Sequence, residues 1–254
     1  MGDDERILGM PEIDGALWPA LPPGWLALLT GSSGSGAPLL AKQFAHAGVG
    51  SVPVLFYTTF ERTEDVTKAF TDFGWDPSEI KVVNLADEYY ERVLVHGLDI
   101  ARAREKGISL DELVVARNQA TPPKSFSLTN RMLSDLAEID HPFRLVLDSV
   151  DFFLEVLEPH DVTTVARQIR HRCRTIGGQA LLTAHSIGHD RAMYGLLHDL
   201  SDLVFELKSE PRGERYEHEL QIQKVANRPD LGRIVRLHVA ENGWATGPGE
   251  RSPG

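Results

Sequence analysis

The chain has 254 residues, of which 42% are hydrophobic, so it can bury a full core at the upper size of one domain. Its 26 basic and 37 acidic residues give a net charge of -11, which disfavours non-specific attraction to nucleic acid or anionic lipid. No apolar run approaches the roughly 18 residues of a membrane span, and the charged start MGDDER is unlike a signal peptide. A single cysteine, Cys173, excludes a disulfide framework, and we expect a cytoplasmic protein without a membrane partner.

Apolar runs and helical patterns alternate along the chain. We expect strands at residues 25–31, 52–60, 81–86, 143–150 and 180–186. We expect helices at residues 38–47, 64–73, 87–117, 131–139 and 162–176. Three further strand candidates with hairpin-like spacing follow at residues 202–210, 216–225 and 233–245. This order predicts an α/β fold with a mainly parallel central sheet flanked by helices and a C-terminal β-meander.

The domain organisation follows from the same pattern. We expect a single domain over residues 1–245, because no internal repeat or second core region interrupts it. Residues 118–130, which contain a Pro-Pro pair, are expected to form a polar loop. Residues 246–254 are expected to form a disordered tail, since they are rich in Gly and Pro and lack apolar residues.

The stretch GSSGSGAPLL follows the first apolar strand and has the glycine spacing of a phosphate-binding loop, G-x-x-x-x-G-K-[ST]. A strand, a glycine-rich turn and a helix N-terminus direct several N–H groups at one spot. The candidate phosphate-binding residues are Gly31, Ser32, Ser33, Gly34, Ser35, Gly36, Ala37 and Pro38. An ordinary flexible Gly/Ser turn is the alternative. Lys42 lies about 7.5 Å further along the predicted helix and on another side, so we do not expect it to reach a phosphate.

Polar residues also follow three other predicted strands. Glu61 follows the second strand in TTFER, Asp148 ends the apolar segment LVLD, and His185 ends LLTAH. Open α/β sheets bind ligands at the C-terminal ends of their strands, so we expect these residues to meet the glycine loop at one sheet edge. A turn-capping role is the alternative for Asp148. His185 and His189 have the spacing of a metal pair, but the glycine between them disfavours a helix, so a polar sensor is the preferred role of His185.

An ordered series of segments resembles one known family. The segments are ILGMPEIDGALWPALPPGWLALLTG, PVLFYTTFER, AFTDFGWD, LVLDSV, ALLTAHS and IQKVANRPDLGRIVRLHVAENGWA. From Ile7 to about Ala245 the chain resembles the KaiC-type branch of the RecA-like ATPases, a group that also contains archaeal RadA paralogues and archaellum or gas-vesicle regulators. The resemblance implies a RecA-like P-loop NTPase fold.

The resemblance also implies that catalytic groups have been lost. The family's P-loop lysine and Mg²⁺-binding hydroxyl fall on Ala37 and Pro38, which makes this a degenerate Walker A loop. The family's paired catalytic glutamates fall on Glu61 and Arg62, so one carboxylate remains. Because phosphoryl transfer depends on positioned cations and an oriented nucleophile, these losses suggest a pseudo-ATPase.

Two other positions carry over from the resemblance. The family's K-M-R segment, whose cations reach the neighbouring subunit's nucleotide, falls on Lys224, Val225 and Ala226, so the arginine is lost. Lys224 is therefore, with Glu61, a residual catalytic residue. Asp148 matches the Walker B aspartate and would be a metal ligand only if a Mg-nucleotide binds.

Two functions remain open. In the first, the protein is a regulator or scaffold that needs no cofactor and acts through a protein partner or self-association. In the second, it binds ATP or ADP with Mg²⁺ weakly or between subunits, as a recombination and DNA-repair accessory or a signal-transduction ATPase. Residues 162–176 carry four arginines, which form a solvated helix face or a DNA-binding patch. Residues 118–130 offer only Lys124 and Phe126 for binding single strands, so nucleic acid is not an expected partner.

Overall fold

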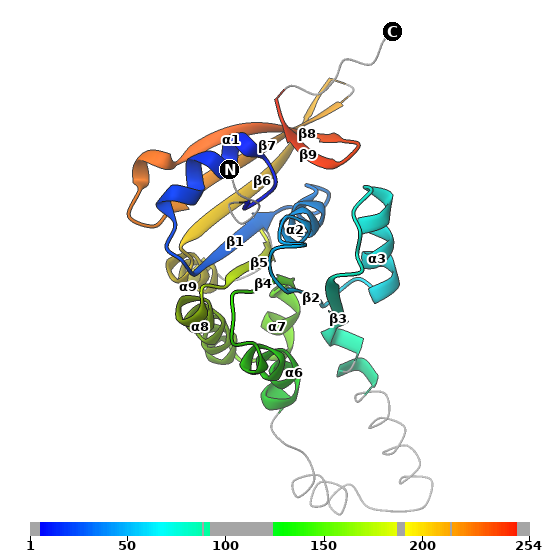
Figure 1. The fold of residues 1–254 in the computed structure, drawn as a ribbon, viewed down its shortest axis with the longest axis vertical. Coiled ribbons are helices and arrows are strands. Elements are labelled where there is room, and N and C mark those ends of the chain that lie inside the picture. The colour runs from blue at the N-terminus through cyan, green and yellow to red at the C-terminus, as the bar shows by residue number, and fades with distance from the viewer. Residues whose placement is uncertain (1–5, 88, 92–123, 187–190, 214, 248–254) are drawn as a thin grey trace, which may run out of the picture.

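The protein folds around one nine-stranded sheet with the strand order β3-β2-β4-β5-β1-β6-β7-β8-β9 (Figure 1). The computed structural model describes residues 6–87, 89–91, 124–186, 191–213 and 215–247. The strands are β1 Trp25–Gly31, β2 Val54–Thr58, β3 Ile80–Asn84, β4 Arg144–Asp148, β5 Gln179–His185, β6 Leu203–Arg212, β7 Arg215–Val225, β8 Arg233–Ala240 and β9 Gly243–Thr246. Strands β3 to β6 in this order are parallel, and β7, β8 and β9 add antiparallel. The predicted parallel sheet with a C-terminal meander is therefore present.

Helices cover both faces of the parallel part of the sheet (Figure 1). On one face lie α1 Pro11–Leu17, α2 Ala37–His46 and α3 Thr63–Asp72. On the other face lie α6 Lys124–Glu138, α7 Asp151–Val156, α8 Pro159–Ile176 and α9 Arg191–Leu200. Two short 3₁₀ turns complete the elements, η2 Trp18–Ala20 and η3 Pro229–Leu231. None of the described helices has both the length and the apolarity that crossing a membrane requires.

Successive side chains of β1 point to opposite faces of the sheet, so this strand packs against both helical layers. Trp25, Ala27 and Leu29 pack into the cluster beneath α1, α2 and α3. Leu26 and Leu28 pack into the cluster beneath α6 to α9. Because both faces are covered, β1 is apolar from Trp25 to Leu29 without alternating polar residues, as buried parallel strands generally are.

The helix α6 differs from its prediction. It begins at Lys124, so it occupies the second half of the polar loop expected at 118–130. Leu128, Met132 and Leu136 recur every four residues in this segment, and this helical spacing outweighs its polar composition. Residues 118–123 lie outside the described part, as do 92–117 of the helix expected at 87–117.

Other elements also differ from those predicted from the sequence. Helices α1, α7 and α9 were not predicted from the sequence, because they are short or interrupted in their apolar pattern. Strand β9 includes Thr246, and the N–H of Gly247 donates to the carbonyl of Arg236 at 3.1 Å, so these two residues are not part of a disordered tail. Residues 248–254 of the expected tail lie outside the described residues.

Candidate functional site

The C-terminal ends of four neighbouring strands bring the predicted site residues to one edge of the sheet. Gly31 at the end of β1 is the register partner of His185 at the end of β5. Asp148 at the end of β4 is the partner of Thr58 at the end of β2. Strand β5 lies between β1 and β4, so Asp148 is about 10 Å from β1 across the sheet, because each strand spacing is about 4.8 Å. The shared edge expected from the sequence is therefore present.

The glycine loop has a defined turn conformation at the N-terminus of α2. Gly34 has φ of 79° and Gly36, the N-cap residue, has φ of 87°, which favour glycine over residues with a Cβ. The N–H of Ser35 donates to the carbonyl of Ser32 at 3.0 Å. The buried hydroxyl of Ser35 accepts the N–H of Ala37 at 3.4 Å. These contacts hold the loop against the first turn of the helix.

Two positions of the loop must also be glycine because neighbouring atoms leave no room for a Cβ. A Cβ placed on Gly31 would lie 2.4 Å from the hydroxyl oxygen of Ser35. A Cβ placed on Gly36 would lie 2.4 Å from the ring of Trp244, whose indole N–H donates to the Gly36 carbonyl at 3.3 Å. The C-terminal strand β9 thus packs on the glycine loop, a contact that the sequence did not reveal.

The remaining carboxylate of the expected catalytic pair is held by a lysine. The ammonium nitrogen of Lys42 lies 2.6 Å from a carboxylate oxygen of Glu61, and the exposed fractions of the two side chains are 4% and 28%. The backbone of Glu61 is also fixed, because its N–H donates to the hydroxyl of Thr58 at 2.9 Å and its carbonyl accepts from Asn84 at 3.1 Å. Lys42 does not extend to a phosphate at the loop but pairs with Glu61. Sequence spacing gave no signal for this pair.

The Walker B-like aspartate is buried at the end of β4. One carboxylate oxygen of Asp148 accepts the hydroxyl of Thr183 at 2.5 Å. Burial is the main influence on Asp148 and raises its pKa, while the Thr183 hydroxyl and the Lys42 ammonium act in the opposite direction. The neighbouring charges of Glu61 and Asp151 add to the increase in pKa. The sequence analysis did not single out Thr183, although it lies in the quoted segment ALLTAHS.

His185 is oriented by an aspartate that the sequence analysis missed. Both carboxylate oxygens of Asp151 accept the backbone N–H of His185 at 3.1 Å, and one of them lies 3.0 Å from the ring nitrogen Nδ1. Burial raises the pKa of Asp151, but hydrogen bonds from Ser149 and His185 outweigh it and lower the pKa overall. The His185 side chain is 54% exposed, so part of the imidazole ring is open to solvent. The only sequence signal for Asp151 is its position in the first turn after a strand end.

The sequence disfavoured a metal pair of His185 and His189, and the described residues do not include both histidines. His189 lies outside them. Among the residues that the structure does describe, no group of three or more His, Cys, Asp or Glu side chains could hold a metal ion.

Lys224 caps a helix within this chain. Its ammonium group donates to the carbonyls of His198 at 2.8 Å and Asp199 at 3.1 Å, in the last turn of α9. A cation at a helix C-terminus satisfies carbonyls that have no intrahelical partner and interacts favourably with the helix dipole. Within this chain, the ammonium group that the resemblance assigned to a neighbouring nucleotide is thus bonded to the end of α9.

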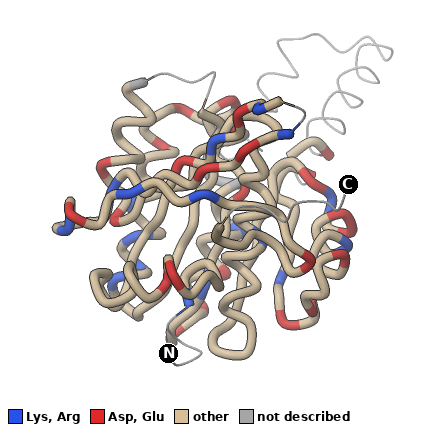
Figure 2. Tube along the Cα trace, turned by 90° about the horizontal axis from the view of Figure 1, so that it is seen from above, with Lys and Arg blue, Asp and Glu red and all other residues tan. Residues whose placement is uncertain are grey.

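Three of the four arginines of α8 have intramolecular partners. Arg170 and Arg174 donate to one carboxylate oxygen of Asp202 at 3.0 and 2.7 Å, and Asp202 is 2% exposed at its side chain. Arg172 donates to backbone carbonyls at the C-terminal end of α6, including that of Leu136 at 3.0 Å. Acidic and basic positions are interspersed along the described trace (Figure 2). These contacts favour a structural role of the arginines over the DNA-binding patch.

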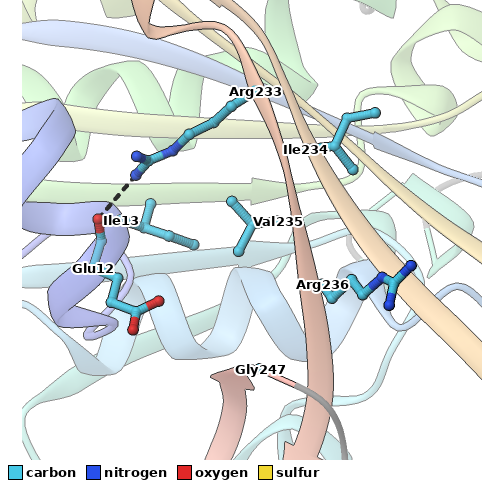
Figure 3. Close-up of a pocket in the computed structure, with 7 residues that line it drawn as sticks. All are labelled: Glu12, Ile13, Arg233, Ile234, Val235, Arg236 and Gly247. Atoms are coloured by element: carbon cyan, nitrogen blue, oxygen red, sulfur yellow. Dashed lines mark hydrogen bonds between the residues drawn. The ribbon is translucent and has the colours of Figure 1, made fainter.

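A groove of 390 Å³ lies between α1 and β8, and Figure 3 shows Ile13 and Val235 facing one another there. The guanidinium group of Arg233 donates to the backbone carbonyl of Glu12 at 2.9 Å and ties the two elements together. The groove contains none of the residues at the C-terminal sheet edge.

A Mg-nucleotide fits this site only in part. The backbone N–H groups of the glycine loop and the N-terminus of α2 suit an anionic phosphate. The side chains do not suit the metal, because Ala37 and Pro38 offer no ligand and Glu61 is already paired with Lys42. Asp148 is buried and bonded to Thr183. At the loop, the described residues therefore lack the side-chain ligands that a magnesium ion takes beside a nucleotide.

Comparisons with known proteins agree with this geometry at the level of fold and family. A family model described as "ATPase: KaiC" matches residues 8–244. The chain is 27% identical to the circadian clock oscillator protein KaiC of Synechococcus elongatus over 233 residues, which cover 88% of this chain and 40% of that protein. It is also 27% identical to the protein of the same name from Rippkaea orientalis, over 81% of this chain and 36% of that protein. The chain thus spans well under half the length of these relatives.

A solved structure shares the fold. The crystal structure of a KaiC-like protein from Pyrococcus horikoshii matches with a TM-score of 0.61 at 21% identity, over 96% of this chain and 99% of that one. The RecA-like α/β fold expected from the sequence is thereby confirmed.

Proposed function

Because the chain belongs to the KaiC family of ATPases, we propose that it is a catalytically degenerate member that regulates or scaffolds, as one RecA-like domain over residues 1–245. The observation that carries this proposal is the start of α2 at Ala37 and Pro38. A P-loop has a lysine and a hydroxyl residue there, which contact the terminal phosphates and Mg²⁺. Alanine supplies no donor, and proline has neither a hydroxyl nor a backbone N–H.

The carboxylates support the same conclusion. A general base must be free to orient and deprotonate the attacking water. Glu61 is instead held by Lys42 at 2.6 Å. Arg62 replaces the second carboxylate of the family and pairs with Asp65 at 2.9 Å on the surface. The missing cation at the loop and the engaged base are independent obstacles to turnover.

The rim of the site offers a surface for a protein partner or a second copy of the chain. Phe60, immediately before Glu61, is 92% exposed. Aromatic side chains are enriched in the cores of protein interfaces. The acidic net charge argues against nucleic acid as that partner. The single cysteine fits the reducing cytoplasm, where we place the protein.

A second candidate function is binding of ATP or ADP without turnover, as in a recombination accessory or signal-transduction protein. It is favoured by one observation, the retained conformation of the glycine loop, in which Gly34 and Gly36 keep positive φ at the N-terminus of α2. Such a loop can bind a phosphate weakly through its backbone alone.

Two measurements on the wild-type protein separate these candidates. Phosphate release with saturating Mg-ATP is expected to equal the buffer background, with Glu61→Gln as the control for a contaminating ATPase. Release that exceeds background and is lost in Glu61→Gln would show a working ATPase and refute the proposal. In a thermal-shift experiment, a nucleotide at 100-fold its Kd would add about 2.7 kcal/mol, or about 5–10 °C. Such a shift without turnover would establish the second candidate.

A further inference from the structure

Two neighbouring strands, β2 and β4, each carry a carboxylate at or just after their C-terminal end, and a buried lysine pairs with one of them. Asp148 and Thr58 are register partners on β4 and β2. The backbone N–H of Glu61 donates to the Thr58 hydroxyl at 2.9 Å, so Glu61 is fixed at the end of β2 beside Asp148. Lys42 extends from α2 to the carboxylate of Glu61, and its side chain is 4% exposed.

The position of Lys42 is unfavourable unless the lysine has a specific partner. The neighbouring residues of α2, among them Leu40, Ala41 and Phe44, are fully buried. An ammonium group taken out of water in such surroundings costs free energy that only a close opposite charge offsets. The Glu61 carboxylate at 2.6 Å is that charge, and the Phe56 ring, 5.8 Å from the ammonium nitrogen, adds a weaker cation–π contact.

The carboxylates likewise need a cation. Like charges at one site oppose each other's ionisation, and burial of Asp148 adds to that cost. In nucleotide sites of this type, a bound divalent ion is the largest local charge and compensates such carboxylates. Here the loop lacks the side chains that would help to hold that ion.

We infer that Lys42 is the resident counter-ion of Glu61, at the sheet edge that Glu61 shares with Asp148, and takes the electrostatic place of a divalent metal ion. The chain thereby stabilises this edge of the sheet by itself, and a metal ion would have to displace the ammonium group to reach Glu61. This inference deepens the proposed function, but it depends on contacts that are independent of ATP turnover.

The test compares Lys42→Met with Lys68→Met by thermal unfolding, in EDTA and with added Mg²⁺ or Mn²⁺. Lys68 is the matched control, because its side chain is 72% exposed and pairs with Asp72 on the surface of α3. In EDTA, Lys42→Met is expected to lose about 5–10 °C in Tm, since it leaves a largely buried carboxylate uncompensated. Lys68→Met is expected to lose less than about 2 °C.

The comparison with added metal ions tests this inference specifically. Lys42→Met should recover part of its Tm in Mg²⁺ or Mn²⁺, because oxygen ligands are then free to bind a hard cation. Wild type and Lys68→Met should be unaffected. Equal Tm values for the two variants in EDTA, no recovery in metal, or an equal gain in wild type would each overturn the inference.

A double variant keeps the test valid if Lys42→Met fails to fold. Lys42→Met combined with Glu61→Gln removes both charges of the pair and should be more stable than Lys42→Met alone. A double variant that is no more stable would overturn the inference. Turnover by the wild-type protein would refute the proposed function alone, whereas unchanged stability of Lys42→Met would refute this inference alone.

Discussion

Restoring the two missing side chains of the glycine loop is the most direct test of what the loop retains. The change is Ala37→Lys together with Pro38→Thr. Both positions lie in the first turn of α2, where lysine and threonine adopt the helical backbone without strain. Replacing proline also returns a backbone N–H to the cluster of N–H groups at the helix N-terminus.

The expected gain in affinity follows from the contacts restored. A charge-assisted hydrogen bond contributes about 1.5–3 kcal/mol. This free energy corresponds to a Kd for Mg-ATP that is about 10–100-fold lower. Turnover should remain low in the double variant, because Glu61 is still held by Lys42 and Arg62 still replaces the second carboxylate.

Isothermal titration with Mg-ATP measures the effect. The control is Ala37→Met with Pro38→Thr, which matches the bulk of the lysine without its charge and should gain much less. Equal, undetectable binding by the wild type and both variants would show that the loop is not a phosphate cradle. Tight binding by the wild-type protein would show that Ala37 and Pro38 are no obstacle.

Three further outcomes are expected. Burial raises the pKa of Asp148, so the folded state holds this proton more tightly than the unfolded state, and wild-type stability falls as pH rises from about 4 through the raised pKa. Asp148→Asn removes this titration and should gain stability relative to wild type between pH 4 and 7 in urea unfolding; parallel pH profiles would contradict it. Gly34→Ala and Gly36→Ala should each lower the free energy of unfolding by about 1–2 kcal/mol, because both glycines have positive φ. Gly36→Ala should lower it by at least about 1 kcal/mol more, because its Cβ would lie 2.4 Å from the Trp244 ring. Equal unfolding midpoints for the two variants would argue against that packing. Fluorescence anisotropy should detect no binding of single-stranded DNA with a Kd below about 10⁻⁶ M at physiological salt; tighter binding would favour a recombination accessory.

The sequence by itself determined the parallel sheet, its meander and the edge at which the candidate residues meet. Apolar runs mark the buried strands, and the C-terminal ends of parallel strands share one edge whatever the details of packing. The prediction from sequence was least accurate at residues 118–130. Composition indicated a loop there, but the four-residue apolar spacing is that of a helix, and α6 begins at Lys124. Local composition was a poorer guide there than periodicity.

The tertiary structure alone decided what the charged side chains do. Lys42 and Glu61 are 19 residues apart, and Asp151 and His185 are 34 apart. Each pair forms because a helix is packed at a particular rotation against strands that are adjacent only in the folded sheet. Spacing within one segment determines which residues share a face of that segment, but it does not determine which residue of another segment they contact. The sequence could therefore exclude Lys42 from a phosphate at the loop, and only the packing of α2 against β2 gave it Glu61 instead.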